Sequence, residues 1–309
     1  MKFLSILTSV TISAFAADSF TDPATAGVDY TIQGEYAGEG CGAQVIALGD
    51  GKFRVVGWDG GLPGTAETVE RKAEITGELK DGKVSFKNAE WDAVLENGVI
   101  SSKHEDKTYT LKKTERKSPT LGAKPPAEAI VLFDGTNADA WKNGKVGDDG
   151  FLSMGVTSKQ TFGDCTLHVE FRTPFMPKAS GQGRGNSGVY LQNRYEVQVL
   201  DSFGLKGENN EAGGIYSKHK PLVNMALPPL TWQTYDIDFT AAKWDADGKK
   251  TASARITVKH NGVIVQNNVE VNSETTAAGM KDGPGPGPLQ LQNHGNPVAY
   301  RNIWLVEKK

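Results

Sequence analysis

The sequence predicts an all-β protein, in which a small antiparallel β domain precedes a jelly-roll-like β-sandwich. Three observations support this fold class. Short apolar or alternating runs recur along the chain, glycine contributes 36 of 309 residues, and helical periodicity is scarce. Turn signals such as Asp81-Gly82 and Asn97-Gly98 separate the runs. Many short strands at this spacing are typical of a sandwich or a barrel.

Length and composition divide the chain into four segments. With 309 residues, 38% of them hydrophobic, the chain can form two ordinary cores. At the start of the chain, Lys2 precedes an apolar run that ends in the small residues Ala14 and Ala16, a pattern typical of a cleaved signal peptide. The run is too short for a membrane span. We therefore expect a periplasmic or secreted protein. The expected segments are a signal peptide (1–16), a small N-terminal β domain of unreadable role (18–112), a linker (113–128) and the jelly-roll domain (129–309).

Each β domain consists of short predicted strands. In the N-terminal domain they are 30–36, 44–48, 52–56, 73–79, 83–86 and 109–111. In the jelly-roll domain they are 129–133, 166–171, 188–191, 195–200, 234–239, 254–259, 263–269, 289–292 and 303–306.

Charge and cysteine content narrow the possible partners. The formal net charge of -3 gives no sign of a nucleic-acid partner. The two cysteines, Cys41 and Cys165, fall in different predicted domains, and an exported protein permits a disulfide between them. The five histidines show no paired metal-ligand spacing. A divalent metal could still bind residues distant in sequence, but no motif indicates one.

The most informative stretch is a predicted hairpin over 188–200 with a three-residue loop at 192–194. This loop pairs Tyr190 with Glu196 and Gly188 with Gln198. Strand alternation then places Val189, Leu191, Tyr195, Val197 and Val199 on a core face and leaves the polar residues on the other.

A second predicted strand shows the same alternation, because Gln290, Gln292 and His294 alternate with apolar residues. Two such strands side by side would form a polar floor. It is either a solvated outer face, which is common in antiparallel sheets, or a surface that binds sugar hydroxyls.

Several motifs resemble those of the 3-keto-disaccharide hydrolase family, in the family's order, over roughly 129–309. They are LFDGT at 132–136 with Trp141, NSGV at 186–189, YEVQVLD at 195–201, GIY at 214–216, GPLQLQNHG at 287–295 and YRNI at 300–303. The resemblance implies a concanavalin-like or laminin-G-like jelly roll that acts on glycosides oxidised to a ketone at sugar carbon 3. The substrate would then be an oligosaccharide or a 3-keto-glycoside.

A 3-oxo group acidifies the hydrogen on C2, so a base can remove it, the glycosidic oxygen can leave from C1, and water can then add. This chemistry needs a base, an acid for the leaving oxygen and a donor to the enolate. Glu196 and His294 are the candidates for the acid and the base, and the sequence does not decide which residue has which role. Arg184 and Arg301 are candidate donors, Asp201 and Asn302 are expected to be structural, and the residues expected to position the sugar are Asn186, Tyr190, Gln198, Gln290 and Gln292.

Two other functions fit the same sequence. A lectin-like module would bind sugars without chemistry, and its stacking platform could come from Trp141, Trp232, Trp244 or Trp304. A laminarinase-type retaining glycosidase would use Glu196 with Asp201. In a regular strand that five-residue step spans about 16 Å and ends on opposite faces, whereas retaining carboxylates lie about 5 Å apart.

Overall fold

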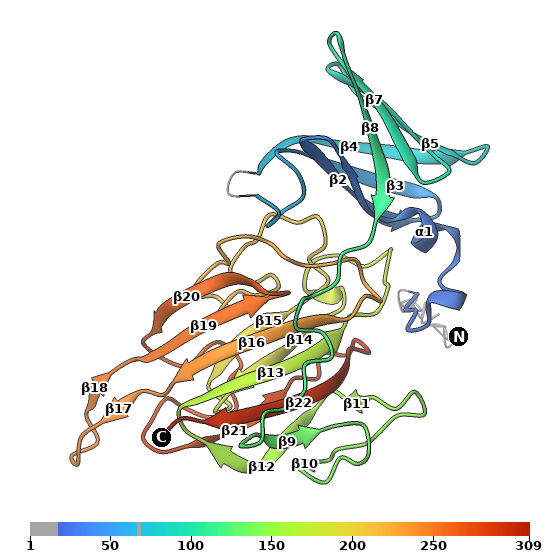
Figure 1. Cartoon of the computed structure of the whole chain (residues 1–309). Coiled ribbons are helices and arrows are strands. Elements are labelled where there is room, and N and C mark those ends of the chain that lie inside the picture. The colour runs from blue at the N-terminus through green and yellow to red at the C-terminus, as the bar shows by residue number, and fades with distance from the viewer. Residues whose placement is uncertain (1–17, 67–68) are drawn as a thin grey trace, which may run out of the picture.

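The computed structural model describes residues 18–66 and 69–309, so the predicted signal peptide lies outside the described residues. The described chain forms two β units, a barrel and a sandwich, and Figure 1 shows the barrel packed against one end of the sandwich. The all-β fold class is therefore confirmed. Among the described residues, no helix is long and apolar enough to cross a membrane.

The N-terminal unit is a closed antiparallel barrel, preceded by a 3-10 turn at Pro23–Thr25 and by helix α1 at Gly27–Ile32. A strand was predicted at 30–36, but its first half is helical, because the Gln33 N–H donates to the Asp29 carbonyl and closes a helical turn. The strands at Trp91–Glu96 and Val99–His104 were not predicted. The barrel strands are β1 Gly34–Gly38, β2 Cys41–Gly49, β3 Lys52–Asp59, β4 Glu70–Lys80, β5 Lys83–Lys87, β6 Trp91–Glu96, β7 Val99–His104 and β8 Lys107–Thr114.

The C-terminal unit packs two antiparallel sheets face to face. The five-stranded sheet has the order β10 Trp141–Lys142, β12 Val156–Phe162, β21 Gly287–Leu291, β14 Ser187–Leu191 and β15 Tyr195–Val199. The seven-stranded sheet has the order β11 Leu152–Ser153, β22 Ala299–Glu307, β13 Cys165–Arg172, β16 Gln233–Thr240, β19 Ala254–His260 and β20 Val263–Val271, with β9 Ile130–Phe133 beside β22. A separate ribbon joins β17 Lys243–Trp244 to β18 Lys250–Ala252, and a 3-10 turn covers Gly181–Gly183.

One apolar core fills the space between the two sheets. Val189, Val197 and Leu291 of the five-stranded sheet pack with Val169 and Ile237 of the seven-stranded sheet, and all five are buried. Apolar residues alternate along these strands because successive side chains point to opposite faces. The sandwich therefore leaves two outer faces for polar side chains, one on each sheet.

The segment between barrel and sandwich lies against the outer face of the seven-stranded sheet, as the green trace below β8 shows in Figure 1. Thr120 donates to an Asp236 carboxylate oxygen at 2.6 Å, and the Gly122 N–H donates to Glu170 Oε1 at 2.5 Å. This segment is therefore held along its length by the sheet that it crosses.

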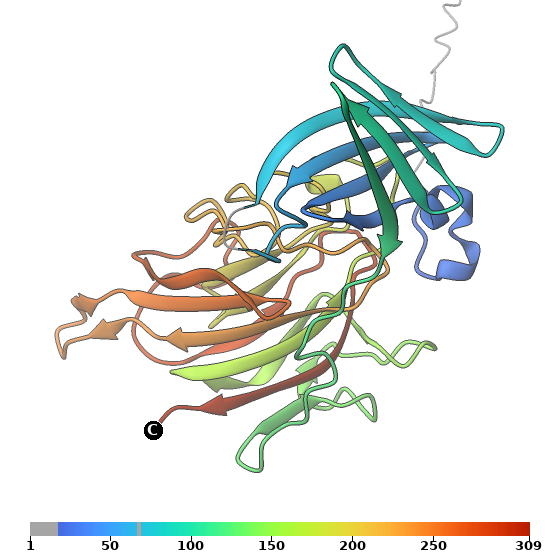
Figure 2. The ribbon, with the colours of Figure 1, turned by 45° about the horizontal axis from the view of Figure 1, so that its top comes forward.

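Side chains of the sandwich also enter the barrel's core. Phe175 and Leu230 are buried in the same apolar cluster as Val45 and Phe53 of the barrel, and Phe20 pairs with Phe175 through two backbone hydrogen bonds of 2.9 Å. Figure 2 shows the close approach of the two units from a second side. The two cysteines are free, and Cys165 is buried in the sandwich core.

Candidate functional site

The predicted polar face exists on the outer side of the five-stranded sheet. In the hairpin of β14 and β15, Tyr190 pairs with Glu196 and Gly188 with Gln198, which confirms the predicted register. On the other side of β14, Tyr190 pairs with Gln290 of β21. Three neighbouring strands thus bring polar side chains together.

Glu196 lies on β15, an edge strand of this sheet, and is only 2% exposed. The Tyr190 hydroxyl donates to its Oε2 at 2.7 Å, and Gln292 Nε2 donates to the Tyr190 hydroxyl at 3.2 Å. Burial raises the pKa of Glu196 to about 7, although the Tyr190 hydrogen bond opposes the shift. Near neutral pH this carboxyl can therefore both accept and donate a proton.

Gly188 makes room for this carboxyl. A Cβ atom at position 188 would lie 2.2 Å from Glu196 Oε1, so any larger residue would displace the side chain. The backbone N–H of Glu196 donates to the Thr275 hydroxyl at 3.0 Å. The carboxyl is thus fixed by a cross-strand glycine and by a phenol, and the Glu196 backbone is held by a loop threonine.

Two amides of the site share a partner that the sequence did not indicate, Gln182. Gln198 Nε2 donates to Gln182 Oε1 at 2.9 Å, and Asn186 Nδ2 donates to the same oxygen at 3.1 Å. Gln182 lies in the 3-10 turn of the glycine-rich segment before β14. Strand alternation gives no signal for Gln182, because positions in an irregular glycine-rich segment follow no such period.

Four of the predicted binding residues hold a buried polar atom that has no hydrogen-bond partner among the described residues. Such atoms are uncommon in folded proteins because each costs roughly 1–3 kcal/mol when it is left unpaired. The atoms are Arg184 Nη2, Asn186 Oδ1, Gln198 Oε1 and Gln290 Oε1.

Asp201 does not approach Glu196 as a second carboxylate. Its Oδ2 accepts from Arg184 Nε at 2.6 Å in a buried ion pair, and its Oδ1 accepts from the Phe203 N–H at 3.3 Å. The causes of the pKa shift of Glu196 are burial and the Tyr190 contact, with no carboxylate among them. Glu196 and Asp201 therefore do not form the carboxylate pair of a retaining glycosidase.

His294 is exposed in the loop that follows β21. The loop is joined to the site where the Asn186 N–H donates to Asn296 Oδ1 at 2.8 Å. Among the described residues, no hydrogen bond joins His294 to Glu196. The structure thus places His294 on a loop next to Asn186 and not in the buried row around Glu196.

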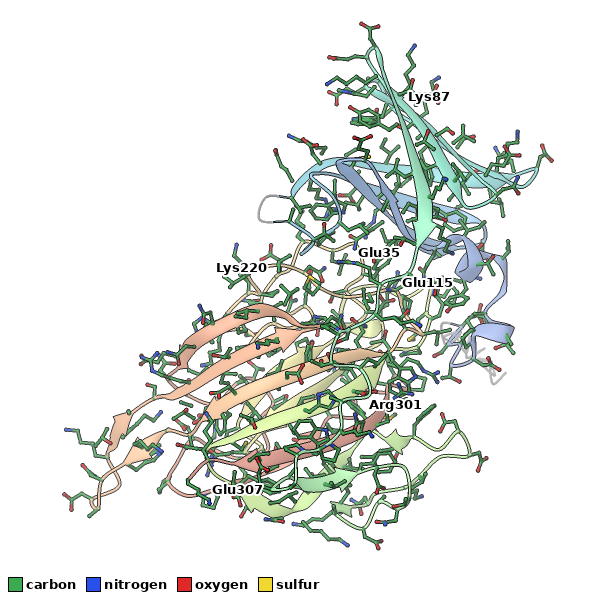
Figure 3. All side chains as sticks on the ribbon, in the orientation of Figure 1. Glu35, Lys87, Glu115, Lys220, Arg301 and Glu307 are labelled. Carbon is green, nitrogen blue, oxygen red and sulfur yellow. The ribbon has the colours of Figure 1, made fainter. Side chains whose placement is uncertain are left out.

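The structure does not bring Arg301 to this face. Arg301 lies on the outer face of the seven-stranded sheet (Figure 3), where its Nε donates to Glu170 Oε2 at 2.7 Å and its guanidinium lies 4.1 Å from the Trp232 ring centroid. Asn302 donates to the same carboxylate at 2.9 Å. Arg301 therefore belongs to a separate polar cluster and pairs with Glu170.

That cluster is an ion network on the sheet that bears β13 and β16. Burial alone would raise the pKa of Glu170, but hydrogen bonds from His168, Asn302, Gly122 and Arg301 lower it to about 2. His168 Nδ1 lies 2.6 Å from Asp236 Oδ1. These contacts fix the crossing segment near Gly122 on the sheet.

The four tryptophans considered for a stacking platform lie away from the Glu196 face. Trp141 is 2% exposed in the core and donates to the Leu132 carbonyl, and Trp304 stacks on His168. Trp232 lies beneath Arg301, and Trp244 lies near Lys250. Within 18–66 and 69–309, no group of three or more His, Cys, Asp or Glu side chains is arranged to hold a metal ion.

A β-sandwich with amide and guanidinium groups packed around a buried carboxyl on one outer face is consistent with a carbohydrate-active protein. The chain belongs to the family described as the 3-keto-alpha-glucoside-1,2-lyase-like domain, whose model matches residues 128–306. The match leaves the barrel outside the family domain.

Solved structures of three proteins from Parabacteroides distasonis, each described as a "putative glycosyl hydrolase", resemble the chain. The first is 37% identical, with a TM-score of 0.53, and the match covers 59% of this chain and 85% of that chain. The other two are 17% and 19% identical, with TM-scores of 0.42 and 0.36, and each match covers 59% of this chain and 94% of that chain. The comparison with curated proteins gave no match.

Proposed function

We propose that the protein cleaves 3-keto-glycosides at the outer face of the five-stranded sheet. The observation that supports this best is the row of unpaired buried polar atoms beside Glu196, a carboxyl with a pKa of about 7. Unpaired donors and acceptors favour a ligand with many hydroxyl groups. Membership of the family favours a ketone at carbon 3 of that ligand.

In the proposed reaction, the Glu196 carboxylate removes the proton from C2 of the keto sugar. The C2–H electron pair forms an enolate with the 3-oxo group, and it then expels the glycosidic oxygen as the C1–O bond breaks. A proton must reach the leaving oxygen, and His294 is the candidate donor on the neighbouring loop. Addition of water across C1 and C2 completes a net hydrolysis.

The raised pKa suits Glu196 to the role of base. A carboxylate with a pKa of 4.5 would be a weak base towards a C–H bond, and basicity grows with the pKa. Burial of Glu196 raises that pKa towards neutral pH. The Arg184 guanidinium, with its unpaired Nη2, is the candidate donor to the enolate oxygen.

The direct test supplies a 3-keto-disaccharide and its unoxidised parent in deuterated water and follows both by NMR. We expect cleavage of the keto sugar alone, with deuterium entering at C2. Glu196→Gln should lose at least about a thousandfold in rate, because the removed group is the base itself.

Glu270→Gln is the matched control, because Glu270 lies on the seven-stranded sheet in an exposed pair with Arg255. Its activity should equal that of the wild type. Equal cleavage of the two sugars would instead identify an ordinary glycosidase. Binding without turnover would identify a lectin-like module.

We also propose that the protein is exported, which rests on the apolar run before Ala16. Expression of the full chain in a Gram-negative host, followed by periplasmic fractionation and N-terminal sequencing, tests this. A mature chain beginning at Ala17 in the periplasm is the expected result, and an intact Met1 in the cytoplasm would contradict it.

A further inference from the structure

The segment 201–216, here named the edge loop, forms one border of the candidate site. Its last residues pair with β15, since the Gln198 N–H donates to the Gly214 carbonyl at 2.9 Å and the Tyr216 N–H donates to the Glu196 carbonyl at 3.1 Å. The Asn210 carbonyl accepts from Gln182 Nε2 at 2.8 Å. The edge loop therefore touches the site's amides through backbone atoms.

The start of the edge loop is held by the barrel. Phe203 is buried in a small apolar cluster with Ile46 and Val56, two residues on the outer face of β2 and β3. Their neighbours Val45 and Val55 point into the barrel's own core. Without Phe203, the barrel would expose two apolar side chains to water.

The backbone beside Phe203 fits the barrel closely. Gly204 has a φ of 72°, which favours glycine, and a Cβ atom there would lie only 2.4 Å from Ile46 Cδ1. Both the backbone conformation and the close contact therefore require glycine at this position. Arg71 Nη1 of β4 donates to the Gly204 carbonyl at 3.3 Å. The contact is thus a specific seat for this turn of the edge loop.

The turn at Phe203 and Gly204 is also linked to the rest of the site. Asp201, which binds Arg184, lies two residues before Phe203. The Ser202 hydroxyl accepts from the Ala212 N–H at 2.9 Å, which ties the start of the edge loop to its end. A shift of this turn would therefore move both Arg184 and the strand that pairs with Glu196.

From these contacts we infer that the barrel, which lies outside the family domain, is a positioning element of the site: it holds the edge loop in the geometry that binds the sugar. The inference rests on the proposed location of the sugar site. It gives Ile46 and Arg71, which touch neither Glu196 nor the unpaired amides, an effect on sugar affinity and, through the Asp201–Arg184 pair, on the rate of the reaction.

The test compares Ile46→Ala with Ile100→Ala. Both substitutions shorten a buried isoleucine of the barrel, but Ile100 is part of the barrel's internal core and has no part in the cluster with Phe203. Hydrogen exchange of the backbone amides of 204–214 is measured for each full-length variant, together with the affinity for a 3-keto-disaccharide by titration calorimetry and with kcat and KM. Arg71→Gln provides a second perturbation if Ile46→Ala folds poorly.

We expect Ile46→Ala to speed exchange in the edge loop about tenfold, because a loop that loses a buried anchor opens more often. KM and the dissociation constant should rise about fivefold to tenfold, and kcat should fall as well, because Arg184 moves with the turn. Ile100→Ala should leave the edge loop and the affinity unchanged. Unchanged exchange in Ile46→Ala and Arg71→Gln, or faster exchange with unchanged affinity, would overturn the inference.

The two proposals fail in different ways. A wild-type chain that binds the keto sugar without cleaving it refutes the proposed reaction, yet the affinity and exchange measurements still decide the role of the barrel. A wild-type chain that binds no keto sugar refutes both the proposed site and its positioning by the barrel.

Discussion

Replacing Glu196 with glutamine should change how the stability of the protein depends on pH. Burial raises the pKa of Glu196 from its ordinary 4.5 to about 7, so the folded state holds this proton more tightly than the unfolded state does. The stability that Glu196 contributes is therefore fully present below pH 4.5 and is lost as the pH rises through 7. A displacement of this size corresponds to about 3 kcal/mol.

Glutamine has nearly the same shape and cannot ionise, so Glu196→Gln should escape this loss. The difference in unfolding free energy, variant minus wild type, should then be about 3 kcal/mol more positive at pH 8 than at pH 4. Urea unfolding at both pH values, followed by tryptophan fluorescence, measures it. Glu270→Gln, which replaces an exposed carboxyl in a surface pair, is the matched control for the substitution. A Glu196→Gln difference that is equal at the two pH values would refute the argument.

Three further predictions concern the two polar clusters. Arg301→Gln should leave sugar affinity within about twofold, because Arg301 lies on the other sheet. It should lower the free energy of unfolding, measured with urea, by about 1–2 kcal/mol, because a buried carboxylate loses a partly exposed partner. Asp201→Asn should cost about 3 kcal/mol in the same assay, because the Arg184 charge stays buried without its partner; a cost below about 1 kcal/mol would contradict this. Burial lowers the pKa of His168, but hydrogen bonds to two carboxylates outweigh burial and raise it. Its stabilising contribution is therefore present below pH 6.5 and is lost above its raised folded pKa. The difference in unfolding free energy between wild type and His168→Gln should thus shrink between pH 5.5 and pH 9. A difference that stays constant over this range would contradict the prediction.

Strand alternation made the central part of the site predictable. A three-residue loop fixes the register of a hairpin, and the register fixes the partner of every residue, so Tyr190 opposite Glu196 followed from the sequence alone. The same reasoning placed Gln290 beside them once the second strand was assumed to be adjacent. Local rules sufficed because the contacts lie between neighbouring strands.

The same alternation could not tell on which sheet Arg301 would lie. It places Arg301 on the face opposite the buried Tyr300, but both sheets of a sandwich have an outer face, and topology decides between them. Gln182 and Thr275 lie in irregular segments, whose side-chain positions depend on contacts between residues distant in sequence. The burial that shifts the pKa of Glu196 depends on such contacts too, so it could not be worked out from strand period.

The entry of Phe175 and Leu230 into the barrel's core bears on how the molecule comes apart. Separation of the two units would open the barrel's core at one end and expose Phe175 and Leu230 of the sandwich to water. Unfolding of either unit alone would therefore destabilise the other, so we expect the two to unfold together. Calorimetry of the protein should accordingly give one endotherm whose calorimetric and van't Hoff enthalpies agree, as expected for a single cooperative unit.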